Sequence, residues 1–473
     1  MKKHIIAPLV AAALLGADVL AATPSTTEVN HPEWSRNAVI YEVNVRQYTP
    51  EGTFKAFQEH LPRLKELGVD ILWFMPIHPI SEKNRKGGLG SYYAVADYKG
   101  VNPEFGTFDD FKAVVDAAHA QGMKVIIDWV PNHTGCDNPW VAEHPDRYAR
   151  NDKGEMFGPF DWTDVYKLDY SNPDTRAAMI DALSYWLKDA GIDGFRCDVA
   201  GQVPVDFWNE ARPQLDAAAS GRPVFMLAEA TEPELMEKCF DMDYNWPMKD
   251  LFSEIAATAG QYTFVAPGTD KPRTFDSKYA STAIDSLLAR QRAEYPADSY
   301  MMNMITNHDL NSWEGTEFER LGNLADAFAV LSYTLPGMPL IYTGQETGLN
   351  RALEFFVKDT PPTWEPRNEY FGFYKKLNEL KHTRPELAAG DRGGELTSYP
   401  TVARDLYVFS RELGKNTTVV AVNLGNAQQS LTFGKAGAPS VAGAVDFFSG
   451  KRVDSLPATL DPGEYLIYTI TEE

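Results

Sequence analysis

Basic residues and cysteines are scarce in this chain of 473 residues, and each scarcity excludes a class of protein. The 44 Lys and Arg are outnumbered by 66 Asp and Glu, which gives a formal net charge of −22. Because a phosphate backbone attracts basic surfaces, we expect no nucleic-acid partner. The cysteines, Cys136, Cys197 and Cys239, are too few for a disulfide framework and too far apart for a zinc site, although one disulfide stays possible.

Long apolar runs are also missing from most of the chain. After the first residues, no stretch approaches the roughly 18 consecutive apolar residues that a membrane-spanning helix needs. At the start, Lys2 and Lys3 precede a mostly apolar run over residues 5–15 and a small-residue site at 19–21. This pattern predicts a signal peptide over residues 1–21. We therefore expect export to the periplasm or the outside of the cell, with no membrane contact once the signal is removed.

Apolar residues are abundant, at 44% of the chain, and aromatic residues make up 12%, so a large core can form. From residue 38 to about 382, short β-branched or aromatic runs alternate with amphipathic stretches, which is typical of parallel βα units. Eight strands are predicted, over residues 39–48, 71–77, 124–130, 194–199, 224–230, 240–246, 301–309 and 339–346. Eight such units predict an α/β fold, a closed (β/α)8 TIM barrel within residues 22–383. Catalytic residues of that fold lie at the C-terminal ends of the strands.

Helix ends are marked by individual residues. Gly68, Gly122 and Gly191 each follow a helical stretch and precede an apolar strand. Glycine at that place can take the left-handed backbone conformation that ends a helix. Thr107 and Asp110 have the spacing of a capping box at the start of another helix.

Two segments depart from the simple barrel. Residues 134–172 form a short insertion after the third strand, rich in Gly, Pro, Asp and aromatic residues, and such loops usually shape a binding cleft. From residue 384 to 473 the helical period stops and a two-residue alternation begins. That alternation predicts a separate antiparallel β domain, which we expect to be a β-sandwich.

Polar residues end several predicted strands in a fixed order. Four such stretches carry the pattern: 128–133 (DWVPNH), 194–198 (GFRCD), 227–229 (LAE) and 306–309 (TNHD). Two more support it: 91–98 (SYYAVADY) and 337–346 (GMPLIYTGQE). Together these stretches resemble the α-amylase family of glycoside hydrolases and span the predicted barrel. The family's usual β domain after the barrel agrees with the C-terminal prediction.

The resemblance implies that Asp198 is the nucleophile and Glu229 the general acid and base of a retaining mechanism. Retention needs two carboxyl groups about 5 to 5.5 Å apart. Asp198 and Glu229 end neighbouring strands, and strands lie about 4.8 Å apart, so this separation is attainable. Strand alternation puts Arg196 on the face of Asp198, so we expect its charge to keep Asp198 ionised. Glu229 has no cation beside it in the sequence, which predicts the raised pKa of a general acid.

The resemblance also implies a set of residues around the sugar at the cleaved bond. They are Asp309, a third carboxylate that grips hydroxyl groups; His133 and His308, which hydrogen-bond the sugar; Tyr93, which stacks beneath it; and Asp128, which supports Arg196 from below. In the insertion, Trp140 and Trp162 are candidates for stacking on more remote sugars, or for packing among themselves.

Asn132 matches a calcium ligand of the family, but two departures count against the metal. Many members have a Lys-His pair where this chain has Gly201 and Gln202, and the insertion is short for a calcium-bearing lobe. One asparagine is not a calcium site, which takes six to eight oxygen atoms. We therefore expect that no cofactor is required.

The expected activity is retaining hydrolysis of α(1→4) bonds in starch-derived maltooligosaccharides, with soluble oligosaccharides preferred over granular starch. Two alternatives stay open. Within the same chemistry, the protein could be a transglycosylase or prefer α(1→6) bonds or short oligosaccharides, because both outcomes share the covalent intermediate. In a different class, it could be a non-catalytic glycan-binding relative, against which the intact set of Arg196, Asp198, Glu229 and Asp309 argues.

Overall fold

The computed structural model describes residues 26–260 and 280–472, so the expected signal peptide at residues 1–21 lies outside the described part. Eight parallel strands form a closed barrel, which confirms the predicted TIM barrel. In order around the barrel the strands are β1 (Ile40–Val43), β2 (Ile71–Phe74), β3 (Lys124–Trp129), β6 (Gly194–Cys197), β7 (Phe225–Ala228), β8 (Met242–Tyr244), β9 (Tyr300–Asn303) and β10 (Met338–Tyr342), which pairs with β1.

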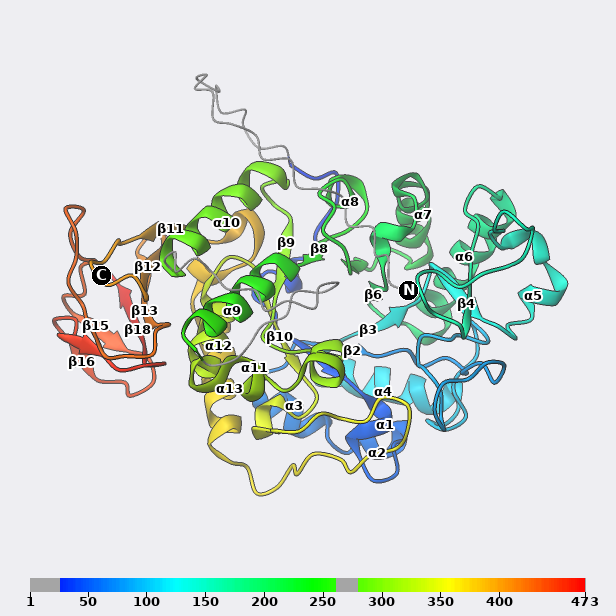
Figure 1. The fold of residues 1–473 in the computed structure, drawn as a ribbon, viewed down its shortest axis with the longest axis horizontal. Helices are drawn as coiled ribbons and strands as arrows, with labels where there is room; N and C mark the ends of the chain where they lie inside the picture. Colours follow the sequence, from blue (N-terminus) through cyan, green and yellow to red (C-terminus); the bar gives the residue numbers. More distant parts are fainter. Residues whose placement is uncertain (1–25, 261–279, 473) are drawn as a thin grey trace, which may run out of the picture.

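Helices surround the barrel on its outer side (Figure 1). They are α1 (Val45–Tyr48), α2 (Phe54–Gln58), α3 (Leu61–Leu67), α4 (Phe108–Ala120), α6 (Pro173–Tyr185), α7 (Val205–Ala218), α8 (Leu235–Lys238), α9 (Trp246–Thr258), α10 (Ala280–Glu294), α11 (Glu317–Leu321), α12 (Ala325–Thr334) and α13 (Glu369–Thr383). The strand predicted over residues 39–48 was too long. It ends at Val43 because Asn44 turns the chain, with its N–H bonded to Thr343 Oγ1 at 2.9 Å, and α1 follows.

The predicted helix ends are confirmed. Gly68, Gly122 and Gly191 have φ angles of 94°, 79° and 74°, which are left-handed values that a Cβ would make costly. At the start of α4, Thr107 Oγ1 accepts the N–H of Asp110, and the Asp110 carboxylate accepts the N–H of Thr107. Each of the three glycine helix ends lets the chain turn back toward the barrel strand that follows it.

The barrel interior contains its own apolar cluster, separate from the larger core between strands and helices. Ile40, Trp73 and Leu227 belong to the interior cluster, whereas Tyr41 and Phe74 belong to the outer core. Successive residues of a strand therefore point to opposite faces. This alternation also turns polar side chains near the strand ends into the mouth of the barrel.

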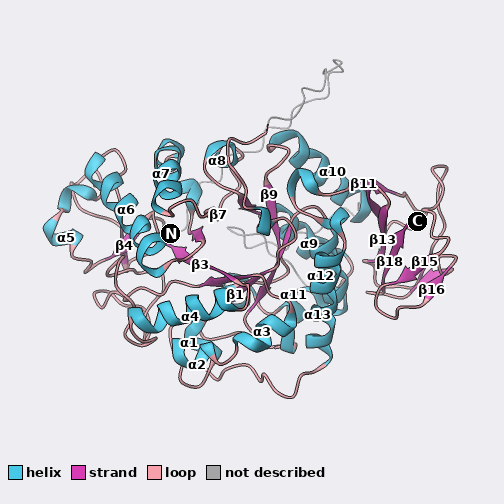
Figure 2. Ribbon diagram, turned by 180° about the vertical axis from the view of Figure 1, so that it is seen from behind, coloured by secondary structure: helices cyan, strands magenta, loops and turns pink. Residues whose placement is uncertain are grey.

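The insertion and the C-terminal region lie at opposite ends of the long axis of the molecule (Figures 1 and 2). The insertion contains β4 (His133–Gly135), α5 (Trp140–Glu143) and β5 (Val165–Lys167). In the C-terminal region an antiparallel six-stranded sheet and a two-stranded sheet contain β11 (Glu395–Ser398), β12 (Leu406–Leu413), β13 (Asn416–Asn423), β14 (Gln429–Ser430), β15 (Ala444–Asp446), β16 (Arg452–Val453), β17 (Thr459–Leu460) and β18 (Tyr465–Thr471).

The structure also bears on the expectations about the three cysteines and about membrane-spanning helices. Cys136, Cys197 and Cys239 are buried and free, so the disulfide left open by the sequence is not formed. Within residues 26–260 and 280–472, no helix combines the length and apolar character needed to cross a membrane.

Candidate active site

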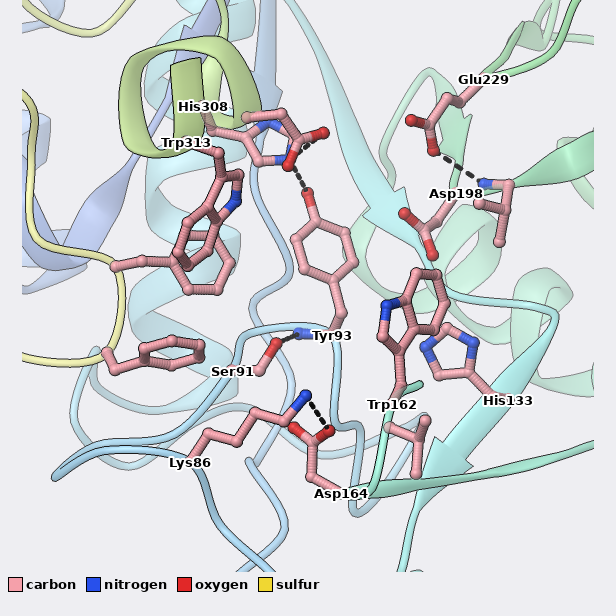
Figure 3. Close-up of a pocket in the computed structure, with 15 residues that line it drawn as sticks. Lys86, Ser91, Tyr93, His133, Trp162, Asp164, Asp198, Glu229, His308 and Trp313 are labelled. Carbon is pink, nitrogen blue, oxygen red and sulfur yellow. Dashed lines mark hydrogen bonds and ion pairs between the residues drawn. The ribbon is translucent and has the colours of Figure 1, made fainter. Parts of the chain in front are cut away.

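A cavity of about 250 Å³ opens at the C-terminal ends of the barrel strands (Figure 3). The predicted residues that line it are Tyr93, His133, Trp162, Asp198, Glu229, His308 and Asp309. The other lining residues, which sequence reasoning missed, are Lys86, Ser91, Asp164, Val165, Val199, Trp313, Phe355 and Phe356. The barrel thus brings together residues from seven separate stretches of the chain.

Arg196 lies beneath the cavity and contacts three carboxylates. Its Nη1 is 2.9 Å from Asp128 Oδ1 and 2.9 Å from Asp198 Oδ1, and its Nη2 is 2.9 Å from Glu229 Oε2. The guanidinium is fully buried, and its Nε donates to Tyr244 Oη at 3.1 Å. One permanent cation therefore orients both residues expected to react and the carboxylate expected to support them.

Arg196 contacts both carboxyl groups that are expected to react. Glu229 has no cation beside it in the sequence, but Arg196 reaches it because β6 and β7 are neighbours and the arginine side chain is long. For Asp198 we expected Arg196 to keep the group ionised. Burial raises the pKa of Asp198 well above its ordinary value, the Arg196 charge lowers it in the expected direction, and the charges of Glu229 and Asp128 add to the rise.

The backbone after the nucleophile candidate is strained. Val199 has φ 38° and ψ 46°, a left-handed conformation that is costly for a β-branched residue. In this conformation its N–H donates to Glu229 Oε2 at 2.8 Å. Strain of this kind persists where the surroundings enforce it, and here it orients a carboxylate in the cavity.

The two histidines of the site are in opposite charge states. Burial lowers the pKa of His133 to about 3, so His133 is neutral. Burial would also lower the pKa of His308, but the negative charges of Asp309 and Glu42 raise it to about 9. His308 is therefore an imidazolium at neutral pH, and no pattern in the sequence distinguishes the charge states of the two histidines.

Tyr93 links the histidine to the carboxylate below it. Its Oη lies 2.7 Å from His308 Nε2 and donates to Asp128 Oδ2 at 3.1 Å. The doubly protonated His308 donates to the tyrosine oxygen, which leaves the tyrosine proton for Asp128. Tyr93 also stacks on His308, with ring centroids 5.4 Å apart and planes at 21°.

The two tryptophans of the insertion lie in different places. Trp162 is at the cavity and contacts the ring of His133, with centroids 5.2 Å apart. Trp140 is not brought to this cavity. It packs 4.5 Å from the Arg147 guanidinium and 5.2 Å from the Tyr98 ring, and it lines a separate cavity.

Three aromatic residues that the sequence analysis did not identify, Trp313, Phe355 and Phe356, form a wall of the cavity opposite Trp162. Trp313 follows β9, is 58% exposed, and contacts Phe355 and Phe356 at centroid distances of 5.3 and 5.8 Å (Figure 3). Trp313 lies four residues beyond Asp309, a sequence signal that could have identified it. The paired phenylalanines lie in the loop after β10, and no spacing rule predicts which way such a loop points.

The backbone oxygen atoms near Asn132 are hydrogen-bonded within the protein. Tyr98 Oη donates to the carbonyl oxygens of Val130 and His133 at 2.7 and 2.8 Å, and Tyr170 Oη donates to that of Pro131 at 2.7 Å. The carbonyl of Asn132 accepts the N–H of Leu168 at 3.0 Å. Within the described residues, no group of three or more His, Cys, Asp and Glu could hold a metal.

Comparisons with known proteins agree with this geometry. Residues 26–164 and 148–361 match the family model described as the α-amylase catalytic domain. The chain is 26% identical to α-amylase MalA of Haloarcula japonica over 92% of this chain and 61% of the relative. It is 28% identical to neopullulanase 2 of Thermoactinomyces vulgaris over 85% of this chain and 72% of that protein. The chain therefore spans less than two thirds of the length of the first of these relatives.

Two solved structures are similar over nearly their whole length. An α-amylase from Lactobacillus plantarum is 30% identical, with a TM-score of 0.77 over 93% of this chain and 100% of that one. A noncanonic maltogenic α-amylase, AmyB, from Thermotoga neapolitana is 28% identical, with a TM-score of 0.79 over 92% and 99%. With the family match covering the barrel and its catalytic mouth, the chain belongs to the α-amylase family of glycoside hydrolases.

Proposed function

We propose that this protein hydrolyses α(1→4) glucosidic bonds in maltooligosaccharides with retention of configuration. The observation that carries the proposal is the contact of Arg196 with both Asp198 and Glu229, at 2.9 Å each. Both carboxyl groups point into the cavity from the ends of neighbouring strands (Figure 3). A pair of this kind, aligned by a shared cation, is what a double displacement at a sugar carbon needs.

In the first step, Glu229 gives its proton to the glycosidic oxygen while the bond from that oxygen to C1 breaks. The Asp198 carboxylate forms a bond to C1 on the opposite face and yields a covalent glycosyl-enzyme. In the second step, Glu229 takes a proton from water, the water oxygen attacks C1, and the bond to Asp198 breaks. Each step inverts C1, so the product keeps the original configuration.

The charges around the cavity support an oxocarbenium-like transition state. In this state the sugar carries positive charge, which the Asp198 and Asp309 carboxylates stabilise. The charged His308 ring lies near Asp309, at an Nε2–Oδ2 distance of 3.4 Å, and attracts that carboxylate, while its Nε2–H donates to Tyr93.

A transglycosylase is the alternative within the same chemistry, because a sugar hydroxyl can replace water in the second step. Maltoheptaose digested over time distinguishes the two activities by chromatography, since only transfer yields products longer than the substrate. Proton NMR of the first products tests the mechanism, because retention gives the α-anomer before mutarotation. A β-anomer as the first product would contradict the double displacement.

We also propose that the protein is exported. The support is the sequence pattern alone: two lysines, a mostly apolar run over residues 5–15 and small residues at 19–21. Mass spectrometry of the protein from its native host would show a chain starting at Ala22. An intact Met1 on the protein outside the cytoplasm would contradict cleavage at this site.

A further inference from the structure

Residues 82–90 follow β2 and form a loop across the mouth of the barrel, which we call the bridging loop. On one side it is bonded to the insertion. Lys86 Nζ is 3.0 Å from Asp164 Oδ1 (Figure 3). Asn84 Nδ2 donates to the carbonyl of Thr163 at 3.2 Å. Lys86 and Asp164 both line the catalytic cavity, so the ion pair is part of its wall.

The bridging loop is also bonded to the insertion through two of its backbone N–H groups. The N–H groups of Glu82 and Lys83 both donate to Asp137 Oδ2, at 2.8 and 2.9 Å. These bonds hold the first residues of the loop independently of the Lys86 side chain.

On its other side the bridging loop is bonded to the loop after β10. The N–H of Leu89 donates to the carbonyl of Phe356 at 2.8 Å. Gly87 has φ 62°, and a Cβ there would lie 2.4 Å from that of Phe356, so only glycine allows this approach. The loop is therefore attached to both walls of the cavity.

The order of the barrel strands shows at which end of the cavity the bridging loop lies. From β7, which carries Glu229, four steps around the barrel in either direction lead to β1. The bridging loop joins the insertion after β3 to the loop after β10, across the ends of β1 and β2, and so lies opposite the acid. Figure 3 accordingly shows Glu229 and Lys86 far apart, at opposite ends of the cavity.

Glu229 protonates the leaving oxygen, so the leaving part of the substrate extends on its side of Asp198. The retained part, the glycone, extends toward the opposite end. There the Asp164 side chain is only 4% exposed, whereas Lys86 is 36% exposed and can donate to a sugar hydroxyl without losing its partner. A cavity of about 250 Å³ lies below the usual range of about 300 to 1,000 Å³ for small-molecule sites, which leaves little room for a long glycone.

We propose that the bridging loop, held by the Lys86–Asp164 ion pair, closes the glycone end of the cleft and limits cleavage to one or two sugars from the non-reducing end. The inference rests on the proposed function and adds the direction and length of the bound chain. Lys86 is a specificity determinant in this arrangement, since it meets the terminal sugar rather than the reacting atoms.

Maltoheptaose with a fluorescent tag at its reducing end tests the proposal, because the length of the tagged product gives the number of sugars removed. At low conversion, the wild type should release mainly tagged maltohexaose and maltopentaose. Lys86→Ala and Asp164→Asn should raise the fraction of shorter tagged products about fivefold, because the loop loses the ion pair that forms part of the cavity wall. Thermal unfolding checks that each variant is folded.

Lys99→Ala is the matched control. It breaks another ion pair, Lys99–Asp181 at 2.6 Å, which lies at a different cavity, so the product lengths should not change. First wild-type products of tagged maltotriose or shorter would overturn the closed end. Equal product lengths in the wild type and both folded variants would overturn the role of the ion pair. Absence of any product from maltoheptaose would instead contradict the proposed function.

Discussion

Glu42 Oε1 lies 2.5 Å from Nδ1 of His308, and both side chains are buried. The other carboxylate oxygen accepts the backbone N–H of His308 at 3.3 Å, so one glutamate fixes both the position and the protonation of the histidine. Glu42 is the charged residue of β1, and its side chain is buried on the face of the strand that turns into the barrel. It is a positioning residue, because it acts on the cavity only through His308.

We predict that Glu42→Gln lowers the pKa of His308 from about 9 by about one unit or more, because the buried negative charge is removed. The histidine ring, which lies near Asp309, then loses its charge at a lower pH. The largest loss of activity is expected at about pH 8 to 9, where the histidine of the variant is neutral while much of the wild-type histidine still carries its charge, and only a small loss is expected at neutral pH.

Histidine-labelled protein followed by ¹⁵N NMR against pH measures this pKa, with His308→Asn used for assignment. Glu42→Asp keeps the charge and should restore part of the raised pKa. An unchanged His308 titration in folded Glu42→Gln protein would show that the glutamate is only a packing residue.

Asp198→Asn should reduce turnover of maltoheptaose by several orders of magnitude without unfolding the protein, because the amide keeps the shape and loses the nucleophilic charge. Glu229→Gln should impair natural substrates far more than activated aryl glycosides, whose leaving group needs no proton. Steady-state kinetics on both substrates measure the difference. Asp181→Asn, at a side chain that is 72% exposed, is the control for the chemical change. Near-normal turnover by pure Asp198→Asn protein would exclude the nucleophile assignment.

The same Asp198→Asn substitution should stabilise the protein at pH 7. Burial raises the pKa of Asp198 in the folded state above the value of about 3.9 expected for the unfolded chain. The native state then binds more protons than the unfolded state above about pH 4, so this carboxyl group lowers stability as pH rises through that window.

Melting temperatures of wild type and Asp198→Asn across pH 4 to 7 check the linkage. We expect the variant to melt a few degrees higher at pH 7, with the difference shrinking toward pH 4. A variant that melts lower at pH 7 would mean that Asp198 stabilises Arg196 more than burial destabilises it.

Trp313→Ala and Trp162→Ala should each lower kcat/KM for maltoheptaose about tenfold, through lost stacking at the cavity. Trp140→Ala should leave kcat/KM unchanged, because its ring packs against Arg147 and Tyr98 away from the cavity. Kinetics on maltotriose and maltoheptaose measure the effects. A loss for Trp140→Ala as large as for Trp162→Ala, in folded protein, would contradict this assignment.

Chelator treatment should change neither the melting temperature nor activity, since Tyr98 and Tyr170 donate to the carbonyl oxygens around Asn132. In contrast, Tyr98→Phe should lower the melting temperature, because two buried carbonyl groups lose their donor. Differential scanning calorimetry with and without millimolar calcium decides the matter. A calcium-dependent rise of several degrees in the wild type would show a bound ion.

The barrel could be predicted from the sequence because it depends on short-range patterns, whereas the roles expected for Asp198 and Glu229 came from the resemblance of ordered stretches to the α-amylase family. Strand alternation places Arg196 and Asp198 on one face, and their position at a strand end follows from the apolar run before them. Helix-ending glycines such as Gly68 have an equally local cause.

Contacts between loops could not be predicted in the same way. The Lys86–Asp164 ion pair joins residues 78 positions apart, and only the closed barrel brings their loops together. The reach of Arg196 to Glu229 depends on side-chain conformation rather than on spacing. The different places of Trp140 and Trp162 have the same origin, because the fold of the insertion, not its composition, decides which ring meets the cavity.

Residues 82–90 are bonded to both walls of the described cavity. On the proposal that they close its glycone end, a released sugar has to leave past Asp198, where the remainder of the polymer lies until it dissociates. We therefore expect the enzyme to release its substrate between cuts rather than slide along it. Intermediates of many lengths should then accumulate in solution, and short products should compete with fresh chains for the same end.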